Sequence, residues 1–137
     1  MSGTSEQQLK GTAIVRKMVT SRSRSNINAF HQKVIDEKGL LNKIVGFLDC
    51  HLNERLQIEA AWVLANVAAG PTDHTKTVID AGALPKLVKL LGSTNEDLQW
   101  QVVWAIGNIA GDESKTRDTV INSDISLILD PLLKYTN

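Results

Sequence analysis

Apolar residues recur along this chain with the spacing of an amphipathic helix. When successive residues are placed about 100° apart, one stripe of the segment 56–70 is apolar throughout. It consists of Leu56, Ala60, Val63, Leu64 and Val67. The segment 98–112 has an equivalent stripe, made of Leu98, Val102, Ala105, Ile106 and Ile109. No alternation of apolar and polar residues is long enough to predict a strand. The pattern therefore predicts an all-α protein with its core along these stripes.

The opposite sides of these two segments group tryptophan with polar residues. Glu59, Trp62 and Asn66 share one face of the first, and Gln101, Trp104, Asn108 and Asp112 share one face of the second. Each tryptophan is followed by an asparagine four residues later, and the pair recurs after 42 residues. One interpretation is that the tryptophans pack between helices while the asparagines make local hydrogen bonds. The recurrence at identical offsets favours a binding face instead.

The same period appears outside these two helices. KTVIDAGALPKLVKLL (76–91) matches RDTVINSDISLILDPLL (117–133), and KVIDEKGLLNKIVGFL (33–48) repeats it with a one-residue shift. Each unit is predicted to form three helices, the first ending at a glycine such as Gly82 and the second starting near a proline such as Pro85. Helical repeats of about 40–47 residues are typical of HEAT and Armadillo proteins.

The period divides the chain into two repeats, 27–70 and 72–112, flanked by partial ones. The chain is expected to start on the third helix of a first repeat, over 5–20, and to end within a fourth, over 113–135. The polar SRSRSN (21–26) is predicted to be a loop. Apolar residues at 127–133 would remain uncovered, whereas solenoids normally end in polar capping repeats. We therefore expect either a piece of a longer protein or a chain that pairs with another copy through its exposed ends.

Composition narrows the range of functions. The 137 residues suffice for one domain, and the 15 basic and 15 acidic side chains cancel, which argues against binding to nucleic acid or to an anionic membrane surface. The single cysteine, Cys50, cannot form an internal disulfide and indicates a reducing compartment. No apolar run approaches the roughly 18 residues needed to span a bilayer. A soluble intracellular protein is expected.

Catalytic and metal sites are not predicted. His31, His51 and His74 lie on different segments without the spacing of a zinc site, so no metal or cofactor is expected. Cys50 has no basic neighbour in sequence and is predicted to pack inertly. GDES (111–114) follows no strand and is better explained as a turn between helices than as a phosphate loop. We expect no enzyme.

The chemistry of the repeated pairs suits an extended peptide. An asparagine amide can donate to and accept from a peptide backbone without contacting its side chains. Indole faces provide apolar walls and attract cations. Asp112, one turn beyond Asn108, adds a carboxylate where an ammonium group would arrive. Together these residues predict a site for a peptide with long basic side chains.

At these residues the chain resembles a known family. AAWVLANVAAG and VVWAIGNIAGD are similar to the third helices of Armadillo repeats in importin-α, and GNIAGD, Gly107 to Asp112, is the most specific element. The resemblance implies a right-handed Armadillo-repeat solenoid that binds basic nuclear localisation signals for nuclear import, in the cytoplasm and the nucleus. It also implies individual roles: Trp62 and Trp104 would flank lysine stems, Asn66 and Asn108 would hold the peptide backbone, and Asp112 would pair with a lysine beside Thr75 and the carbonyl of Gly70, with Gln101 contacting a neighbouring basic side chain.

The chain also departs from that family. We expect no basic autoinhibitory and importin-β-binding segment in these residues, and a third Trp/Asn pair is missing. Trp100 is an extra aromatic residue, which could widen the aromatic surface or pack against an adjacent repeat. Two alternatives therefore stay open: a general Armadillo scaffold for another extended partner, or a truncated or engineered fragment that self-associates through its ends.

Overall fold

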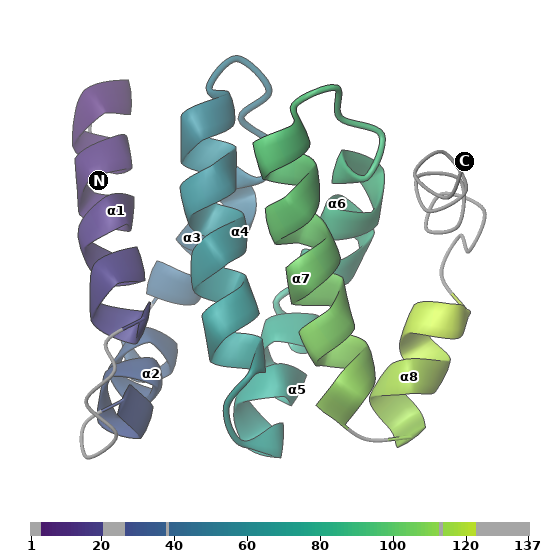
Figure 1. The fold of residues 1–137 in the computed structure, drawn as a ribbon. Helices are drawn as coiled ribbons and strands as arrows, with labels where there is room; N and C mark the ends of the chain where they lie inside the picture. Colours follow the sequence, from purple (N-terminus) through teal and green to yellow (C-terminus); the bar gives the residue numbers. More distant parts are fainter. Residues whose placement is uncertain (1–3, 21–26, 38, 113, 123–137) are drawn as a thin grey trace.

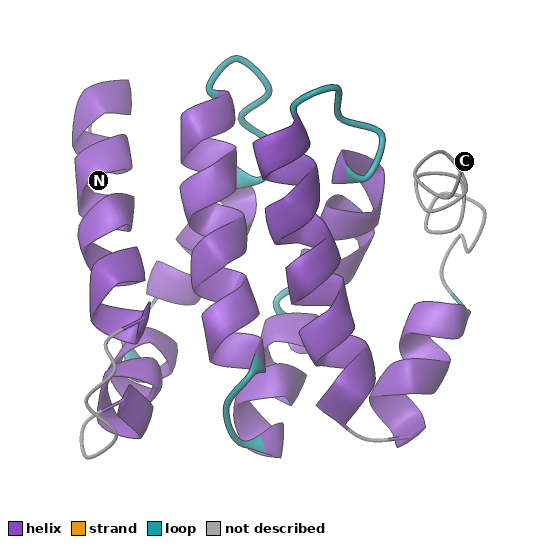
Figure 2. Cartoon of the chain, viewed as in Figure 1, coloured by secondary structure: helices purple, strands orange, loops and turns teal. Residues whose placement is uncertain are grey.

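The computed structural model describes residues 4–20, 27–37, 39–112 and 114–122, and every regular element in them is a helix (Figure 1; Figure 2). The helices are α1 (Ser5–Thr20), α2 (Ile27–Asp36), α3 (Leu40–Phe47), α4 (Glu54–Ala68), α5 (Thr72–Asp80), α6 (Ala83–Leu90), α7 (Glu96–Asp112) and α8 (Ser114–Ile121). The prediction of an all-α protein is confirmed. The loop expected at 21–26 and the part of the expected fourth repeat from residue 123 onwards lie outside the described residues.

Three long helices form one layer of the molecule. Figure 1 shows α1, α4 and α7 side by side, with α3 and α6 behind them and α2 and α5 near one end. α4 packs against both α1 and α7. Because it has neighbours on two sides, it buries a second stripe beyond its aliphatic one, and that stripe contains Ala61, Ala65 and Ala68. Small side chains at these positions let the flanking helices approach closely.

Both predicted core stripes are buried. All ten of their residues are at most 5% exposed, and they pack in one cluster with the apolar faces of α3 and α6. Full burial of an aliphatic side chain contributes roughly 1.5–3 kcal/mol relative to exposure. The core therefore follows the 3.6-residue periodicity of the sequence.

The long helices α4 and α7 begin with the same capping arrangement. The side-chain oxygen of Asn53 accepts from the Leu56 N–H at 3.1 Å, and that of Asn95 accepts from the Leu98 N–H at 3.1 Å. Such N-caps satisfy a backbone donor that the first helical turn leaves unpaired. Asn53 and Asn95 are 42 residues apart, which is also the separation of the two tryptophans. The cap therefore places each Trp/Asn pair at the same height on its helix.

A second recurrent bond ties each long helix to the helix before it. The Gln57 amide donates to the Leu48 carbonyl at 2.9 Å, and the Gln99 amide donates to the Leu91 carbonyl at 2.7 Å. Both acceptors are carbonyls just after α3 and α6, groups that a helix end leaves without an internal partner. Together with the caps, these bonds set the rotation of α4 and α7 about their axes.

Candidate peptide-binding face

The two Trp/Asn pairs lie on neighbouring helices. We call Trp62 with Asn66 the Trp62 rung and Trp104 with Asn108 the Trp104 rung. α4 and α7 pack side by side along their length (Figure 1). The Asn108 side-chain amide donates to the carbonyl of Ala65 on α4 at 2.7 Å, directly beside Asn66. The structure therefore brings the two rungs next to each other, as the repeat period predicts.

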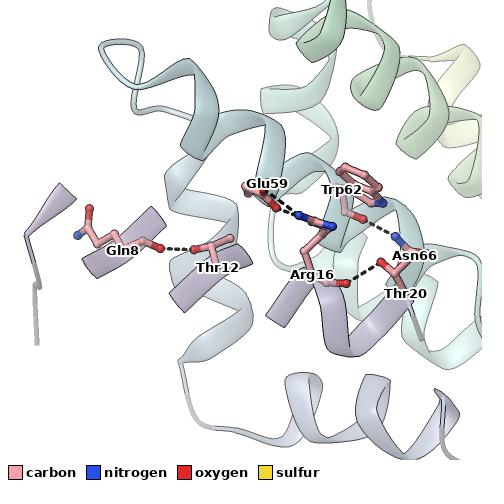
Figure 3. A network of polar contacts seen from close by, with 7 residues as sticks. All are labelled: Gln8, Thr12, Arg16, Thr20, Glu59, Trp62 and Asn66. Atoms are coloured by element: carbon pink, nitrogen blue, oxygen red, sulfur yellow. Dashed lines mark hydrogen bonds and ion pairs between the residues drawn. The ribbon is translucent and has the colours of Figure 1, made fainter. Parts of the chain in front are cut away.

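The Trp62 rung is partly covered by the chain's own side chains. Trp62 is half-buried, and the Arg16 guanidinium of α1 lies over its ring, 4.3 Å from the centroid. Glu59, one turn before Trp62, accepts from Arg16 Nε at 2.7 Å and from Nη2 at 3.3 Å (Figure 3). The Asn66 amide donates to the Trp62 carbonyl on its own helix at 2.9 Å. One hydrogen of this amide is thus used within α4.

The Trp104 rung is open. The Trp104 side chain is 66% exposed, while Gln101 and Asn108 beside it are half-buried. Trp100, one turn earlier on α7, is 71% exposed. Its counterpart 42 residues earlier, Ile58, is half-buried against the core, so this position can pack against a neighbour as well as face a ligand.

Asp112 is the last residue of α7 and forms one end of the face. Its Oδ1 accepts from the Thr72 hydroxyl of α5 at 3.4 Å. Its Oδ2 is inaccessible to solvent and has no hydrogen-bond partner within the described residues. An unpaired buried carboxylate oxygen is costly, and an ammonium group is the donor that would satisfy it best. Asp112 Oδ2 is therefore an unsatisfied acceptor at the end of this face.

Of the two other predicted site residues, Gly70 lies in the turn between α4 and α5, and Thr75 lies in the first turn of α5. Thr75 is fully buried, and its hydroxyl donates to the Ala68 carbonyl at 3.0 Å. The hydroxyl that contacts Asp112 belongs to Thr72 instead. Gly70 is half-buried directly after α4. Thr75 therefore holds the turn that presents Gly70 and Thr72, while its own side chain faces the interior.

Behind Gly70 lie two histidines, His31 and His74, that were not predicted to be neighbours. The rings of His31 and His74 are 6.2 Å apart between centroids, and both are 4% exposed. His31 Nε2 donates to the Val19 carbonyl at 3.0 Å and His74 Nε2 donates to Gln32 Oε1 at 2.9 Å. Both acceptors are oxygens, so in each ring Nε2 carries a proton. Among the described residues the two Nδ1 atoms have no hydrogen-bond partner, and a Cβ on Gly70 would lie 3.2–3.3 Å from them.

The pair differs from a metal centre in its ligand number. Across the described ranges no group of three or more His, Cys, Asp or Glu residues could hold a metal ion. Burial lowers the pKa of His74, and the neighbouring His31 lowers it further. The separation of 43 residues, one repeat, is the sequence signal that could have linked the two histidines.

Within the residues that the structure describes, no helix is long and apolar enough to cross a membrane.

Comparison with known proteins agrees with this architecture. The Armadillo/beta-catenin-like repeat family matches residues 71–111. Importin subunit alpha-4 of Arabidopsis thaliana is 40% identical over 90 residues, which are 66% of this chain and 16% of that protein. Among solved structures, a designed armadillo repeat protein superposes with a TM-score of 0.85 at 29% identity, over 99% of this chain and 54% of the other. A designed armadillo repeat protein in complex with peptide (KR)4 superposes with a TM-score of 0.69 at 32% identity, over 97% and 62%.

The stacked three-helix units and their recurrent caps are those of an Armadillo-repeat solenoid, and residues 71–111 match the Armadillo repeat family. The curated relatives that the chain matches include importin α subunits from plants, mouse and yeast. The chain spans about a sixth of the length of these relatives.

Proposed function

We propose that this chain binds basic nuclear localisation signals as extended peptides across the Trp62 and Trp104 rungs, as an adaptor in nuclear protein import that works in the cytoplasm and the nucleus. The repeats would be 5–20, 27–70, 72–112 and 113–135, and the face would lie on the third helices of the second and third. The chain would act by binding alone, without catalysis.

The proposal depends most on the carboxylate of Asp112. Its unpartnered Oδ2 lies one turn beyond Asn108, at the end of the open rung. A lysine stem could lie along the Trp104 indole, and its ammonium would pair with the Asp112 carboxylate once that side chain turns its buried Oδ2 outwards. The relatives named as importin α subunits and the designed neighbour solved with (KR)4 support a basic peptide as the ligand.

The asparagines would fix the peptide backbone. Asn108 uses one hydrogen of its amide to bond Ala65, so its second hydrogen and its oxygen remain for a ligand. Asn66 has the same capacity after bonding the Trp62 carbonyl. Because both amides are held by helix carbonyls, they are oriented before the peptide arrives, which lowers the entropy cost of binding.

A charge-removal experiment tests the proposal. A labelled lysine-rich peptide is titrated into the wild-type chain and into Asp112→Asn, and each lysine is replaced in turn by norleucine, which keeps the stem and removes the ammonium. Replacing one particular lysine should weaken binding by about tenfold or more in the wild type, because a charge-assisted bond contributes about 1.5–3 kcal/mol. The same replacement should hardly change the affinity for Asp112→Asn.

Asp80→Asn is the matched control, since it removes one exposed carboxylate of the same type from α5. It should leave the lysine preference intact. Equal affinity for every norleucine peptide, or an equal loss in Asp80→Asn, would contradict the proposal and favour a general Armadillo scaffold with another partner.

A further inference from the structure

Trp100 extends the open part of the peptide-binding face towards the start of α7. It is 71% exposed, and it precedes Trp104, which is 66% exposed, by four residues. Residues four apart in a helix are separated by about 6 Å along the axis and lie nearly on the same side of it. The two indoles are therefore neighbouring aromatic surfaces that are both open to solvent.

The same four-residue spacing continues in both directions along α7. Glu96 lies one turn before Trp100 and is exposed, while Asn108 and Asp112 follow Trp104 at the same interval. The 17 residues of α7 include three carboxylates and no lysine or arginine. Members of this series turn by only about 40° from one to the next, so neighbours can contact one ligand. The helix thus carries, in order, a carboxylate, two indoles, an amide and a second carboxylate.

The corresponding positions of α4 are used within the fold. The residue 42 positions before Trp100 is Ile58, which is half-buried against the core. The counterpart of Glu96 is Glu54, whose carboxylate accepts a hydrogen bond from the Asn95 side-chain amide. An aromatic ligand surface at the helix start is therefore a feature of α7 that the other repeat does not share.

This surface fits a guanidinium better than an ammonium group. Arginine has a planar, weakly hydrated head that stacks on aromatic faces and binds a carboxylate through two parallel hydrogen bonds. Lysine carries a compact, strongly hydrated charge, which loses more on leaving water. A guanidinium over Trp100 would have the indole beneath it and the Glu96 carboxylate one turn away.

The direction of the peptide side chains separates this surface from Asp112. Because α1, α4 and α7 lie side by side, a peptide that crosses both rungs runs across the helix axes (Figure 1). Alternate side chains of an extended chain point to opposite sides. A lysine that points along α7 towards Asp112 is therefore accompanied by side chains that point towards Trp100, at an odd number of positions from the lysine.

We propose that Trp100 and Glu96 form an arginine-selective subsite beside the Trp104 rung. The peptide would place its essential lysine at Asp112 and, at an odd spacing from it, an arginine whose guanidinium stacks on Trp100. A lysine in that second place would bind more weakly. This inference rests on the proposed function and adds a side-chain preference to it.

Exchange of arginine and lysine in the peptide tests the subsite. Each basic position of a labelled peptide is changed between arginine, lysine and norleucine, and every peptide is titrated into the wild type and into Trp100→Ile, which introduces the residue found at the corresponding position of α4. In the wild type, one position at an odd spacing from the essential lysine should prefer arginine over lysine by about two- to fivefold, the size of an exposed cation–π contact. That preference should disappear in Trp100→Ile.

Three further variants separate the contributions. Glu96→Gln should reduce the preference for arginine, whereas Glu37→Gln, which removes an exposed glutamate that follows α2, should leave it unchanged. Leu52→Ala removes a fully exposed apolar side chain from the loop before α4 and is the control for Trp100→Ile. Because Trp100 is mostly exposed, Trp100→Ile should keep the unfolding midpoint of the wild type.

The outcomes distinguish this inference from the proposed function. If no lysine of the peptide is essential, the proposed function fails and this inference with it. If one lysine is essential but no other position prefers arginine, only the arginine subsite is overturned. An arginine preference that persists in Trp100→Ile, an equal loss in Leu52→Ala, or a lowered unfolding midpoint in Trp100→Ile would also overturn it, the last by assigning Trp100 to packing.

Discussion

The two rungs have the same residues at the same offsets, yet the fold uses them differently. Trp62 is half-buried under Arg16, and its partner Asn66 bonds within its own helix. Trp104 is 66% exposed, and its partner Asn108 bonds across to Ala65 of α4. The difference arises from the neighbouring helices: α1 places Arg16 over the Trp62 ring, whereas the residue of α4 that follows Arg16 by 42 positions is Ile58.

One motif can therefore serve both structure and binding. The interpretation of tryptophan as a packing residue fits the Trp62 rung in part, whereas the interpretation as a ligand surface fits the Trp104 rung. A repeated sequence motif predicts where side chains lie on each helix. It does not predict what the adjacent repeat places against them.

Truncating the two tryptophans should separate these roles with the largest effect. Trp62→Ala removes a half-buried ring and the support for Arg16, and should lower the free energy of unfolding by about 2–3 kcal/mol. Trp104→Ala removes a mostly exposed ring and should lower it by less than about 1 kcal/mol. Urea unfolding followed by circular dichroism measures both. Similar losses from the two variants would contradict the distinction between the rungs.

Acidification should lower the stability of the fold by a smaller amount, through His74 of α5. The pKa of His74 is lowered from its ordinary value of 6.5 by burial and by His31. Below about pH 6.5 the unfolded chain therefore binds more protons than the folded one. Stability is complete above that pH and falls as the pH drops towards the lowered pKa.

His74→Gln should weaken that pH dependence, because glutamine does not titrate and can still donate to Gln32. His51→Gln, at an exposed position, serves as the control. Unfolding midpoints measured between pH 7.5 and pH 5 test this. An unchanged pH profile in His74→Gln would show that His74 does not cause the pH dependence of stability.

Much of the fold followed from the sequence because helical periodicity and the repeat act locally. The ten core positions, the range of α1 and the placement of both Trp/Asn pairs needed only a 3.6-residue spacing and a 42-residue shift. The contact of Arg16 with Trp62 could not be predicted, since it depends on how α1 is set against α4. The burial of Thr75 was missed because its hydroxyl bonds a helix-end carbonyl, which the residue type alone does not reveal.

The three tryptophans can report directly whether an extended basic peptide lies across the Trp104 rung beside Asp112. Their indole N–H resonances, assigned with single Trp→Phe variants, can be followed while a lysine-rich peptide is added. We predict that the Trp104 resonance shifts most, that Trp62 shifts less, and that the Trp104 shift is lost in Asp112→Asn. Saturable binding that leaves Trp104 unmoved, or a Trp104 shift that persists in Asp112→Asn, would contradict the account.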